Sequence, residues 1–318
     1  MNERDVIKLA WRVLTRDPEE VLGLDDASAL KIGERFLVLN VDMFDEETDL
    51  LPGMTPEDVG WKALVAALSD VAAKGARPRA CLVSVSFPKN VSKDFVERFY
   101  EGLNSAAKRY KVGILGGDTS FTSKFYVAIV AFGFSNAVIP RGGANTGDVV
   151  VTTGEYGLTS AAYLYLLGNF QCRRKLTRVL KSVYRPEPQL LKWVELASYF
   201  SSTIDSSDGL ALSLHYLAEA SNKSIVIENV PIAEDARACF EEWGLDPLDK
   251  SLYEGGEEYE LIATIPRDLF PKALARARSI GLSLYVIGHV KEGEGVFLRR
   301  GRSLERVEPR GWLHRSLT

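Results

Sequence analysis

The alternation of hydrophobic and polar positions predicts a chain of short strands separated by helices. Runs of β-branched and aromatic residues predict strands, and apolar positions repeated every three to four residues predict helices. The run 36–41 predicts a strand that ends at Asp42, and 125–134 predicts a second one. Further strands are expected in a short stretch ending at Leu115 and at 149–153, 225–230, 260–265, 284–290 and 295–299.

The clearest helix is predicted over 55–76. Thr55 is a suitable N-cap, Pro56 fits the first turn, and Asp58 completes a capping box. Gly75, followed closely by a proline, ends this helix. Other helices are predicted at 92–110, 157–168, 187–200, 208–221 and 267–280. Because strands and helices alternate in both halves, the pattern predicts a mixed α and β fold with layered sheets.

The chain has 318 residues, which is too long for one small module and suits two domains. Gly, Pro and Asn residues concentrate at 136–147, a composition typical of a connecting loop. We therefore expect an N-terminal domain over 1–137 and a C-terminal domain over 138–318.

Composition excludes several classes of protein. Hydrophobic residues make up 46% and charged residues 26% of the chain, so it can fill a core and is not disordered. The net charge of -4 gives no overall attraction to nucleic acid, and no nucleic-acid partner is expected. The charged start at residues 1–5 is not typical of a secretory signal, and no run approaches the roughly 18 apolar residues of a membrane helix. The expectation is a cytoplasmic protein without a membrane partner.

The cysteines and histidines of this chain predict neither a metal site nor a catalytic triad. Cys81, Cys172 and Cys239 are far apart and form no CxxC motif, so neither a disulfide framework nor a structural zinc site is expected. Three histidines leave little for histidine-based metal binding or a Ser-His-Asp triad. The chain also lacks the Gly-Lys of a Walker A loop and the patterns G-x-G-x-x-G, H-R-D and G-x-S-x-G.

Carboxylates, by contrast, recur at turn-like positions beside predicted strands. They are Asp25, Asp26, Asp42, Asp118, Asp205 and Asp208. Aspartate also caps helices and forms turns, which is the alternative at any one position. Four such places in one chain favour a ligand site, because strand ends gather ligand groups in open α/β sheets.

Asp70 is the most informative single residue, because it lies in a helix of otherwise small and apolar residues. A buried carboxylate without a partner is either costly or protonated, and a bound cation would compensate it. The alternative is a helix that exposes a polar stripe through Lys62, Ser69 and Lys74. Carboxylate clusters without His or Cys select hard cations, Mg²⁺ foremost, and several Mg²⁺ ions imply a polyphosphate ligand.

At this point the residues match a known family. The chain resembles the thiamine-monophosphate kinases of the aminoimidazole-ribonucleotide-synthetase-like superfamily. The matching segments follow the family order over nearly the whole chain: Leu24-Asp-Asp-Ala-Ser28, Val41-Asp42, 60–78, Gly116-Gly-Asp-Thr119, 140–148, Arg185-Pro-Glu-Pro188, 204–210, 253–261 and Gly311-Trp312. Leu-Ser-Asp-Val-Ala-Ala and Gly-Gly-Glu-x-Tyr-Glu-Leu together are the specific part of the match.

The resemblance implies an N-terminal mixed-sheet α/β domain that pairs with its copy in a homodimer, and a C-terminal α+β sandwich domain that completes the cleft. It implies direct in-line transfer of the ATP γ-phosphoryl to thiamine monophosphate, giving thiamine diphosphate. Because a phosphate monoester has its second pKa near 6, the accepting oxygen is already anionic at pH 7 and no general base is needed. Such catalysis rests on positioning and charge neutralisation.

The resemblance also assigns roles by position. The implied Mg²⁺ ligands are Asp26, Asp42, Asp70, Asp118, Asp205 and Asp208, and the catalytic residues among them are Asp42, Asp70 and Asp118. The implied ATP contacts are Tyr100, Gly117, Asp118, Arg141 and Ser207, although an arginine in a Gly-rich loop is as often merely solvated. The implied contacts to thiamine monophosphate are Asp49, Glu257 and Trp312.

The chain departs from the family pattern at a few positions. Val41 replaces a common Thr, 157–160 replaces a common Gly-Asp-Ser, Glu258 replaces the Asp of Glu-Asp-Tyr, and Asp49 stands where His is common. None of these changes removes an implied metal ligand. Three alternatives remain: a selenophosphate synthetase, which usually has an N-terminal Cys or selenocysteine, an aminoimidazole ribonucleotide synthetase, and a nucleotide-binding regulator without catalysis.

Overall fold

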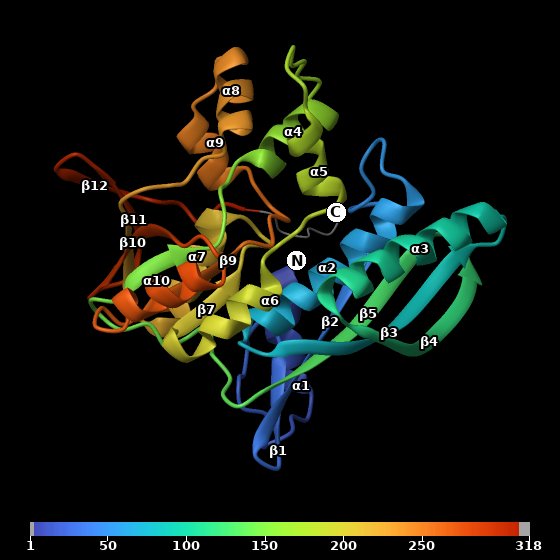
Figure 1. The fold of residues 1–318 in the computed structure, drawn as a ribbon, viewed down its shortest axis with the longest axis horizontal. Helices are drawn as coiled ribbons and strands as arrows, with labels where there is room; N and C mark the ends of the chain where they lie inside the picture. Colours follow the sequence, from blue (N-terminus) through green and yellow to red (C-terminus); the bar gives the residue numbers. More distant parts are fainter. Residues whose placement is uncertain (1–2, 312–318) are drawn as a thin grey trace.

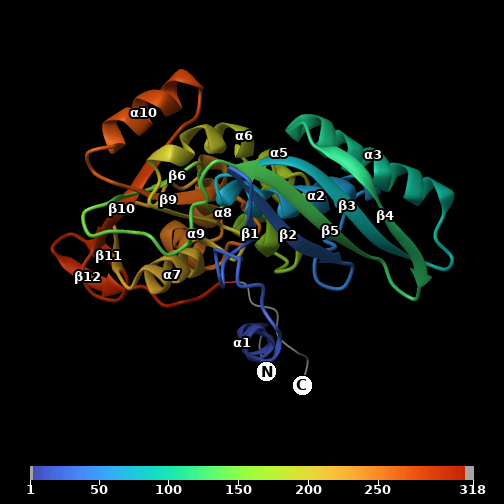
Figure 2. The ribbon, with the colours of Figure 1, turned by 90° about the horizontal axis from the view of Figure 1, so that it is seen from below.

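Two β-sheets are formed by successive parts of the chain within residues 3–311, which the computed structural model describes (Figure 1). The first sheet has strands β1 (Ser28–Ile32), β2 (Arg35–Asp45), β3 (Arg77–Pro88), β4 (Gly113–Thr122) and β5 (Tyr126–Ser135). Their order is β1-β2-β5-β3-β4, with β3 and β4 parallel and the other neighbours antiparallel. The helices of this part are α1 (Glu3–Val13), α2 (Pro56–Ala73) and α3 (Lys93–Tyr110). Helix α1 is largely exposed and projects from the molecule (Figure 2).

The second sheet is larger. Its strands are β6 (Val149–Thr152), β7 (Ser202–Asp205), β8 (Ser224–Ile227), β9 (Leu261–Ile265), β10 (Tyr285–Lys291), β11 (Gly295–Arg300) and β12 (Ser303–Arg306), in the order β12-β11-β8-β10-β6-β9-β7. Its helices are α4 (Leu158–Leu166), α5 (Thr177–Tyr184), α6 (Leu190–Trp193), the 3-10 helix η1 (Val194–Tyr199), α7 (Leu210–Ser221), α8 (Glu234–Glu242), α9 (Pro247–Tyr253) and α10 (Phe270–Ser279). The fold class is therefore a two-domain mixture of α and β, as predicted.

Helix α2 lies between the two sheets and positions the site. The predicted capping box is present: the Thr55 side chain accepts from the Asp58 N–H, and the Asp58 carboxylate accepts from the Thr55 N–H at 2.9 Å. Fourteen of the residues in α2 are buried, and they contact β2 and β5 on one side and β7 and β9 on the other. The apolar surface that buries α2 is shared by both sheets, so it holds them together.

Helices α2 and α3 pack unusually closely at two glycines. A Cβ atom added to Gly102 would lie 1.9 Å from the Glu57 carbonyl oxygen, and one added to Gly60 would lie 2.1 Å from that of Phe99. The two backbones therefore touch directly, which requires glycine at both positions.

Several elements differ from the sequence predictions. The expected helix 187–200 is a short α6 followed by η1, and the short strand ending at Leu115 extends to Thr122 as β4. The pattern also gave no bounds for four strands, β1, β3, β7 and β12, and it missed four helices, α1, α5, α8 and α9. No helix among the described residues is both long enough and apolar enough to cross a membrane.

Candidate active site

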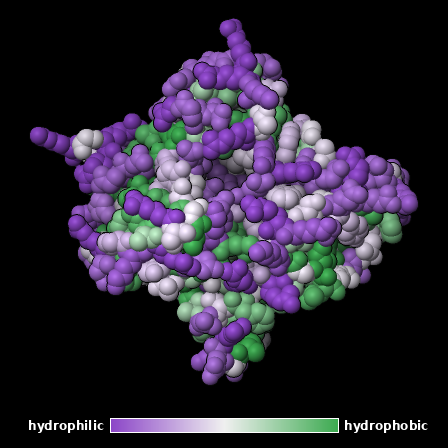
Figure 3. Space-filling model, in the orientation of Figure 1, coloured by the Kyte–Doolittle hydropathy of each residue, from purple (hydrophilic) through white to green (hydrophobic). Residues whose placement is uncertain are grey.

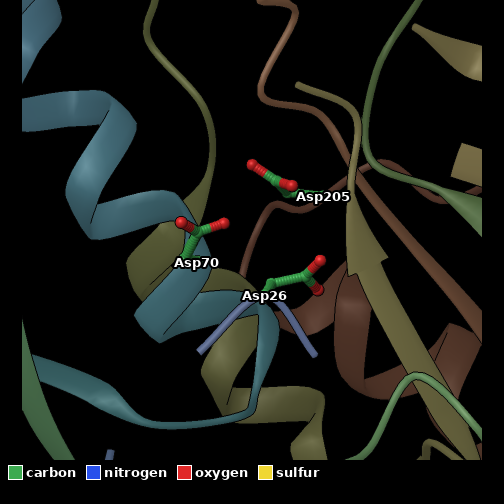
Figure 4. A group of neighbouring side chains, drawn as sticks. All are labelled: Asp26, Asp70 and Asp205. Carbon is green, nitrogen blue, oxygen red and sulfur yellow. The ribbon is translucent and has the colours of Figure 1, made fainter. Parts of the chain in front are cut away.

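Three carboxylates from distant parts of the chain meet beside α2. Asp26 lies in the bend before β1, Asp70 near the end of α2, and Asp205 at the end of β7. One oxygen of each lies within 4.8 Å of those of the other two. Figure 4 shows the three side chains close together, with Asp70 on α2. Because Asp205 belongs to the second sheet and Asp70 to the helix between the sheets, the cluster exists only when the two halves are packed together.

The alternation of β2 delivers further polar groups to this side. Val41 and Met43 are exposed on one face of the strand, so Asn40 and Asp42, which alternate with them, point toward α2. The Asn40 amide donates a hydrogen bond to the Asp70 carboxylate at 2.5 Å. The strand therefore supplies both a hydrogen-bond donor for Asp70 and another carboxylate, Asp42, in the same cavity.

Asp26 has two cationic partners. The Lys74 ammonium lies 2.6 Å from a carboxylate oxygen of both Asp25 and Asp26 and donates to the Thr203 carbonyl at 2.8 Å. The Arg141 guanidinium donates to Asp26. Burial alone would raise the pKa of Asp26, but the charges of Arg141 and Lys74 outweigh it and lower this pKa. Asp26 is therefore ionised and held in place.

Asp70 and Asp205 carry no comparable cationic partner. Burial, followed by repulsion from Asp205 and Asp26, raises the pKa of Asp70 well above its usual value. Burial and the charge of Asp26 raise the pKa of Asp205 to about 7, although Ser69 and Ser207 donate hydrogen bonds to it. Three oxygen ligands with excess negative charge suit a hard divalent cation, which would let both carboxyls ionise.

A cavity of about 480 Å³ extends from these carboxylates to a second polar group at its other end. There the Lys62 ammonium lies 2.6 Å from a carboxylate oxygen of Glu257 and 3.4 Å from the Asp49 carbonyl oxygen. The Tyr163 hydroxyl also donates to Glu257. Lys62 is the one cation among the described residues that line the cavity, whereas acidic residues line it throughout. A phosphate could therefore find one ammonium at this end and bound cations at the other.

The structure places most predicted site residues in or beside this cavity. Those that line it are Asp42, Asp49, Asp70, Asp205, Ser207, Asp208 and Glu257. Asp26 joins Asp70 and Asp205 in the cluster, and Arg141 lies behind Asp26. The merely solvated alternative for Arg141 is wrong, because its guanidinium binds Asp26 and its backbone N–H donates to Asp25 at 2.7 Å. Trp312 lies outside the described residues.

Three predicted residues lie elsewhere in the single chain. Tyr100 is exposed on α3, and Gly117 and Asp118 lie on the edge strand β4. Asp118 pairs in register with Ser84 of β3, and Ser84 is exposed on the face opposite α2. Since paired residues point to the same face, the Asp118 side chain points away from Asp70.

Sequence reasoning missed the role of two lysines. The alternative to a bound cation at Asp70 was that Lys62, Ser69 and Lys74 form an exposed polar stripe on this helix. That alternative is wrong. Their exposed fractions are 1%, 0% and 0% for Lys62, Lys74 and Ser69. A buried lysine needs a carboxylate partner, so lysines in the same apolar helix as Asp70 were a usable signal.

Glu258 is buried between Glu257 and Tyr259, which both line the cavity. It accepts a hydrogen bond from Thr159 at 2.9 Å, and burial raises its pKa to about 8. Glu260 is similar: it accepts from Thr153, and burial raises its pKa to about 7. The departure of Glu258 from the family pattern therefore changes a buried carboxyl rather than a residue of the cavity wall.

Comparison with known proteins defines first a class and then a family. Residues 24–135 match the family model described as AIR synthase related protein, N-terminal domain. The thiamine-monophosphate kinase of Nitrosopumilus maritimus (strain SCM1) is 31% identical over 315 residues, which cover 99% of this chain and 98% of that protein. That of Pyrococcus abyssi is 33% identical over 316 residues, with coverages of 99% and 96%. The chain belongs to the thiamine-monophosphate kinase family and is a kinase.

Solved structures agree with this assignment. A structure of AaThiL complexed with AMPPCP and TMP is 30% identical, covers 98% of this chain and 97% of its own, and gives a TM-score of 0.87. The resemblance, the fold class and the enzyme class predicted from the sequence are confirmed. HypE in a HypE–HypF complex is 20% identical with a TM-score of 0.78 and shares the fold alone.

Proposed function

We propose that this kinase transfers the γ-phosphoryl group of ATP directly and in line to thiamine monophosphate, giving thiamine diphosphate, with several Mg²⁺ ions. The observation that carries the proposal is the cluster of Asp26, Asp70 and Asp205 at one end of an acidic cavity. The names of the relatives and the AMPPCP and TMP bound to AaThiL support the choice of both substrates.

The carboxylates that would hold Mg²⁺ are Asp26, Asp42, Asp70, Asp205 and Asp208, together with Asp118. Bound Mg²⁺ would supply neutralisation of the phosphate oxygens. Lys74 and Arg141 keep Asp26 ionised, and Asn40 orients Asp70. These residues fix the carboxylates in advance, which reduces the reorganisation needed during transfer.

The opposite end of the cavity would hold thiamine monophosphate. Asp49 and Glu257 would contact it, with Trp312 as a further predicted contact beyond the described residues. Lys62 would meet the phosphate when the Glu257 carboxylate turns toward the cationic thiazolium ring. The accepting phosphate oxygen is already anionic at neutral pH, so the chain needs to hold two anions together rather than remove a proton.

The predicted ATP contacts are Tyr100, Gly117, Arg141 and Ser207. Arg141 and Ser207 lie at the acidic cluster, whereas Tyr100 and Gly117 lie elsewhere in the chain. In a homodimer, a neighbouring copy would supply the contacts that one chain lacks. The face of the first sheet opposite α2 exposes apolar side chains: Val41, Met43, Leu82, Tyr126 and Phe134, with Leu115 and Phe121 exposed on the adjacent β4. Figure 3 shows hydrophobic surface in green over β3 and β4. Asp118 lies on this face, so a second copy packed here could bring its Asp118 to the neighbouring cluster.

We further propose the domain boundary between residues 137 and 138 and a cytoplasmic location, where ATP is abundant. The boundary is supported by the strand ranges, since the first sheet ends at Ser135 and the second begins at Val149. The family model for the N-terminal domain also ends at residue 135.

Turnover of thiamine monophosphate tests the function. Purified protein with ATP and Mg²⁺ should form thiamine diphosphate, and EDTA should abolish the reaction because six carboxylates cannot neutralise phosphate charge. Thiamine itself, which lacks the phosphate, is the control acceptor and should give no product. Full turnover in EDTA, or none with Mg²⁺ at any pH, would contradict the proposal.

A further inference from the structure

Two cysteines that are distant in the sequence lie in contact. Cys172 is in the loop that joins α4 to α5, and Cys239 is on α8. Their sulfur atoms are 3.2 Å apart, although 67 residues separate them. The loop begins directly after Leu167, which lines the active-site cavity. Sequence spacing predicted no disulfide, whereas the fold brings these two thiols together.

The contact is held by the residues on both sides of Cys172. The Trp243 indole N–H donates to the Gln171 carbonyl at 2.8 Å, and the Arg173 backbone N–H donates to the Glu242 carboxylate at 3.0 Å. The rings of Phe170 and Trp243 also pack with centroids 5.2 Å apart. The loop is therefore docked on the end of α8, and the two sulfur atoms meet without a change of fold.

The two thiols differ in access to solvent. Cys172 is partly exposed, whereas only 1% of Cys239 is exposed. Burial raises the pKa of Cys239 to about 12, with a further contribution from Cys172. An oxidant in solution therefore meets Cys172 first, and Cys239 is placed to resolve the product. The third cysteine, Cys81, is buried in β3 of the other sheet.

We propose that Cys172 and Cys239 are a modification site that forms a reversible disulfide and fastens the α4–α5 loop to α8. In the first step the Cys172 thiolate attacks a small-molecule disulfide, whose S–S bond breaks and releases one thiolate. The Cys239 thiol then loses its proton and attacks the Cys172 sulfur, and the second small-molecule thiolate leaves and takes up that proton. The protein loses two hydrogen atoms, and the small disulfide is reduced to two thiols.

The geometry allows this reaction with a small local movement. A disulfide is about 2.05 Å long, so the sulfur atoms must approach by about 1.1 Å from their present 3.2 Å. A crosslink between two residues that are 67 positions apart in the sequence removes conformational freedom from the unfolded chain. It therefore stabilises the folded protein.

Peptide mapping of the full-length protein tests the site. The protein is incubated with oxidised glutathione, alkylated without reduction, digested and analysed by mass spectrometry. We expect a linked peptide containing Cys172 and Cys239, an alkylated Cys81, and loss of the link after dithiothreitol. Oxidation should also raise the melting temperature by a few degrees, and dithiothreitol should reverse the rise.

Cys172→Ser is the matched control, because this half-exposed loop position tolerates the change. Its melting temperature should not respond to oxidised glutathione, and Cys239 should remain a thiol. A wild-type protein that keeps both thiols, or that retains glutathione on Cys172 without forming the link, would overturn the inference.

Discussion

At the scale of single residues, the site divides its carboxylates into two kinds. Asp26 is neutralised within the chain by Lys74 and Arg141, and its pKa is lowered. Asp70 and Asp205 lie close together with no cationic partner comparable to those of Asp26, and their pKa values are raised. The first kind is a fixed anchor, and the second kind has a strong electrostatic reason to bind a cation.

Asp70→Asn tests whether the carboxylates with a raised pKa bind a cation. Loss of this charge should reduce kcat by roughly 10²–10³, as for other transition-state charge contacts. In EDTA the variant should be at least as stable as wild type, because it removes repulsion among three acidic groups. Steady-state kinetics and thermal unfolding measure the two effects.

Asp268→Asn is the control, since Asp268 is exposed in the turn before α10. It should change neither kcat nor stability. If Asp70→Asn instead keeps full activity and unfolds at a lower temperature, Asp70 has a structural role.

Glu258 gives a prediction for pH dependence. Its pKa rises from 4.5 in the unfolded chain to about 8 in the folded protein, so the folded protein binds this proton more tightly. The stability from this group is therefore present below pH 4.5 and is lost as the pH rises toward 8. Glu258→Gln should remove this loss and raise the free energy of unfolding at pH 8.5 by ~1–3 kcal/mol, given about 1.4 kcal/mol per pKa unit.

Urea unfolding in EDTA at pH 6 and at pH 8.5 measures this effect. The difference between the two pH values should be smaller in Glu258→Gln than in wild type. Glu305→Gln, at an exposed position on β12, is the control and should follow the wild type. An equal pH dependence in Glu258→Gln would show that Glu258 titrates normally.

At the scale of elements, the contact between α2 and α3 reverses a local preference. Helix propensity alone favours Ala over Gly by about 1 kcal/mol. At Gly102, however, the new methyl group would collide with the Glu57 carbonyl oxygen of α2. Gly102→Ala should therefore lower the free energy of unfolding by ~1–3 kcal/mol, as overpacking typically does. Urea unfolding measures the change.

Ser105→Ala is the matched control on the same helix. Ser105 is exposed, so its replacement should be neutral or slightly stabilising through propensity. A Gly102→Ala protein more stable than wild type would mean that the two helices can separate at little cost.

The sequence predicted elements well where the periodic pattern was long. The helix over 55–76 and the strand over 125–134 correspond to α2 and β5, because capping residues and a continuous apolar run mark them. It missed β3, whose serines alternate with apolar residues and which has Pro78 as its second residue and Pro88 as its last. It also missed α8 and α9, which have only nine and seven residues and little apolar periodicity. Short elements obtain their stability from tertiary packing, which a local pattern does not contain.

The candidate site was predicted in part. The repeated aspartates and the family resemblance gave the residues that line the cavity, because carboxylates at strand ends are visible in the sequence. The partners of those carboxylates were not visible. Lys74 and Asp25 are 49 residues apart, and Lys62 and Glu257 are 195 apart, so only the packed fold shows that they pair.

At the scale of the whole molecule, the exposed apolar face of the first sheet predicts a homodimer. Light scattering at micromolar concentration should give twice the chain mass of 35.2 kDa. Val41→Glu places a charge on this face, where 67% of Val41 is exposed, and should shift the protein toward monomer. Leu304→Glu is the control, because Leu304 is similarly exposed on β12 of the other sheet. A monomeric wild type would exclude the dimer.

Complementation then tests whether the copies share a site. Asp70→Asn and Asp118→Asn should each be nearly inactive alone. If Asp118 serves the neighbouring copy, a mixed dimer has one intact site, and random mixing should restore about one quarter of wild-type activity. Failure to restore activity, with mixed dimers present, would place Asp118 outside the shared site.

The position of α2 between the sheets has a consequence for the size of the acceptor. Lys62 and Asp70 are on the same helix, so backbone hydrogen bonds fix their separation along its axis at roughly 12 Å. One inserted residue between them would turn Asp70 by about 100° away from the cavity. The helix therefore fixes the distance between the two ends of the cavity. Point substitutions can alter what binds at the Lys62 end or at the Asp70 end without altering this distance. A relative that accepts a longer or shorter molecule would have to change the loops of the opposite wall.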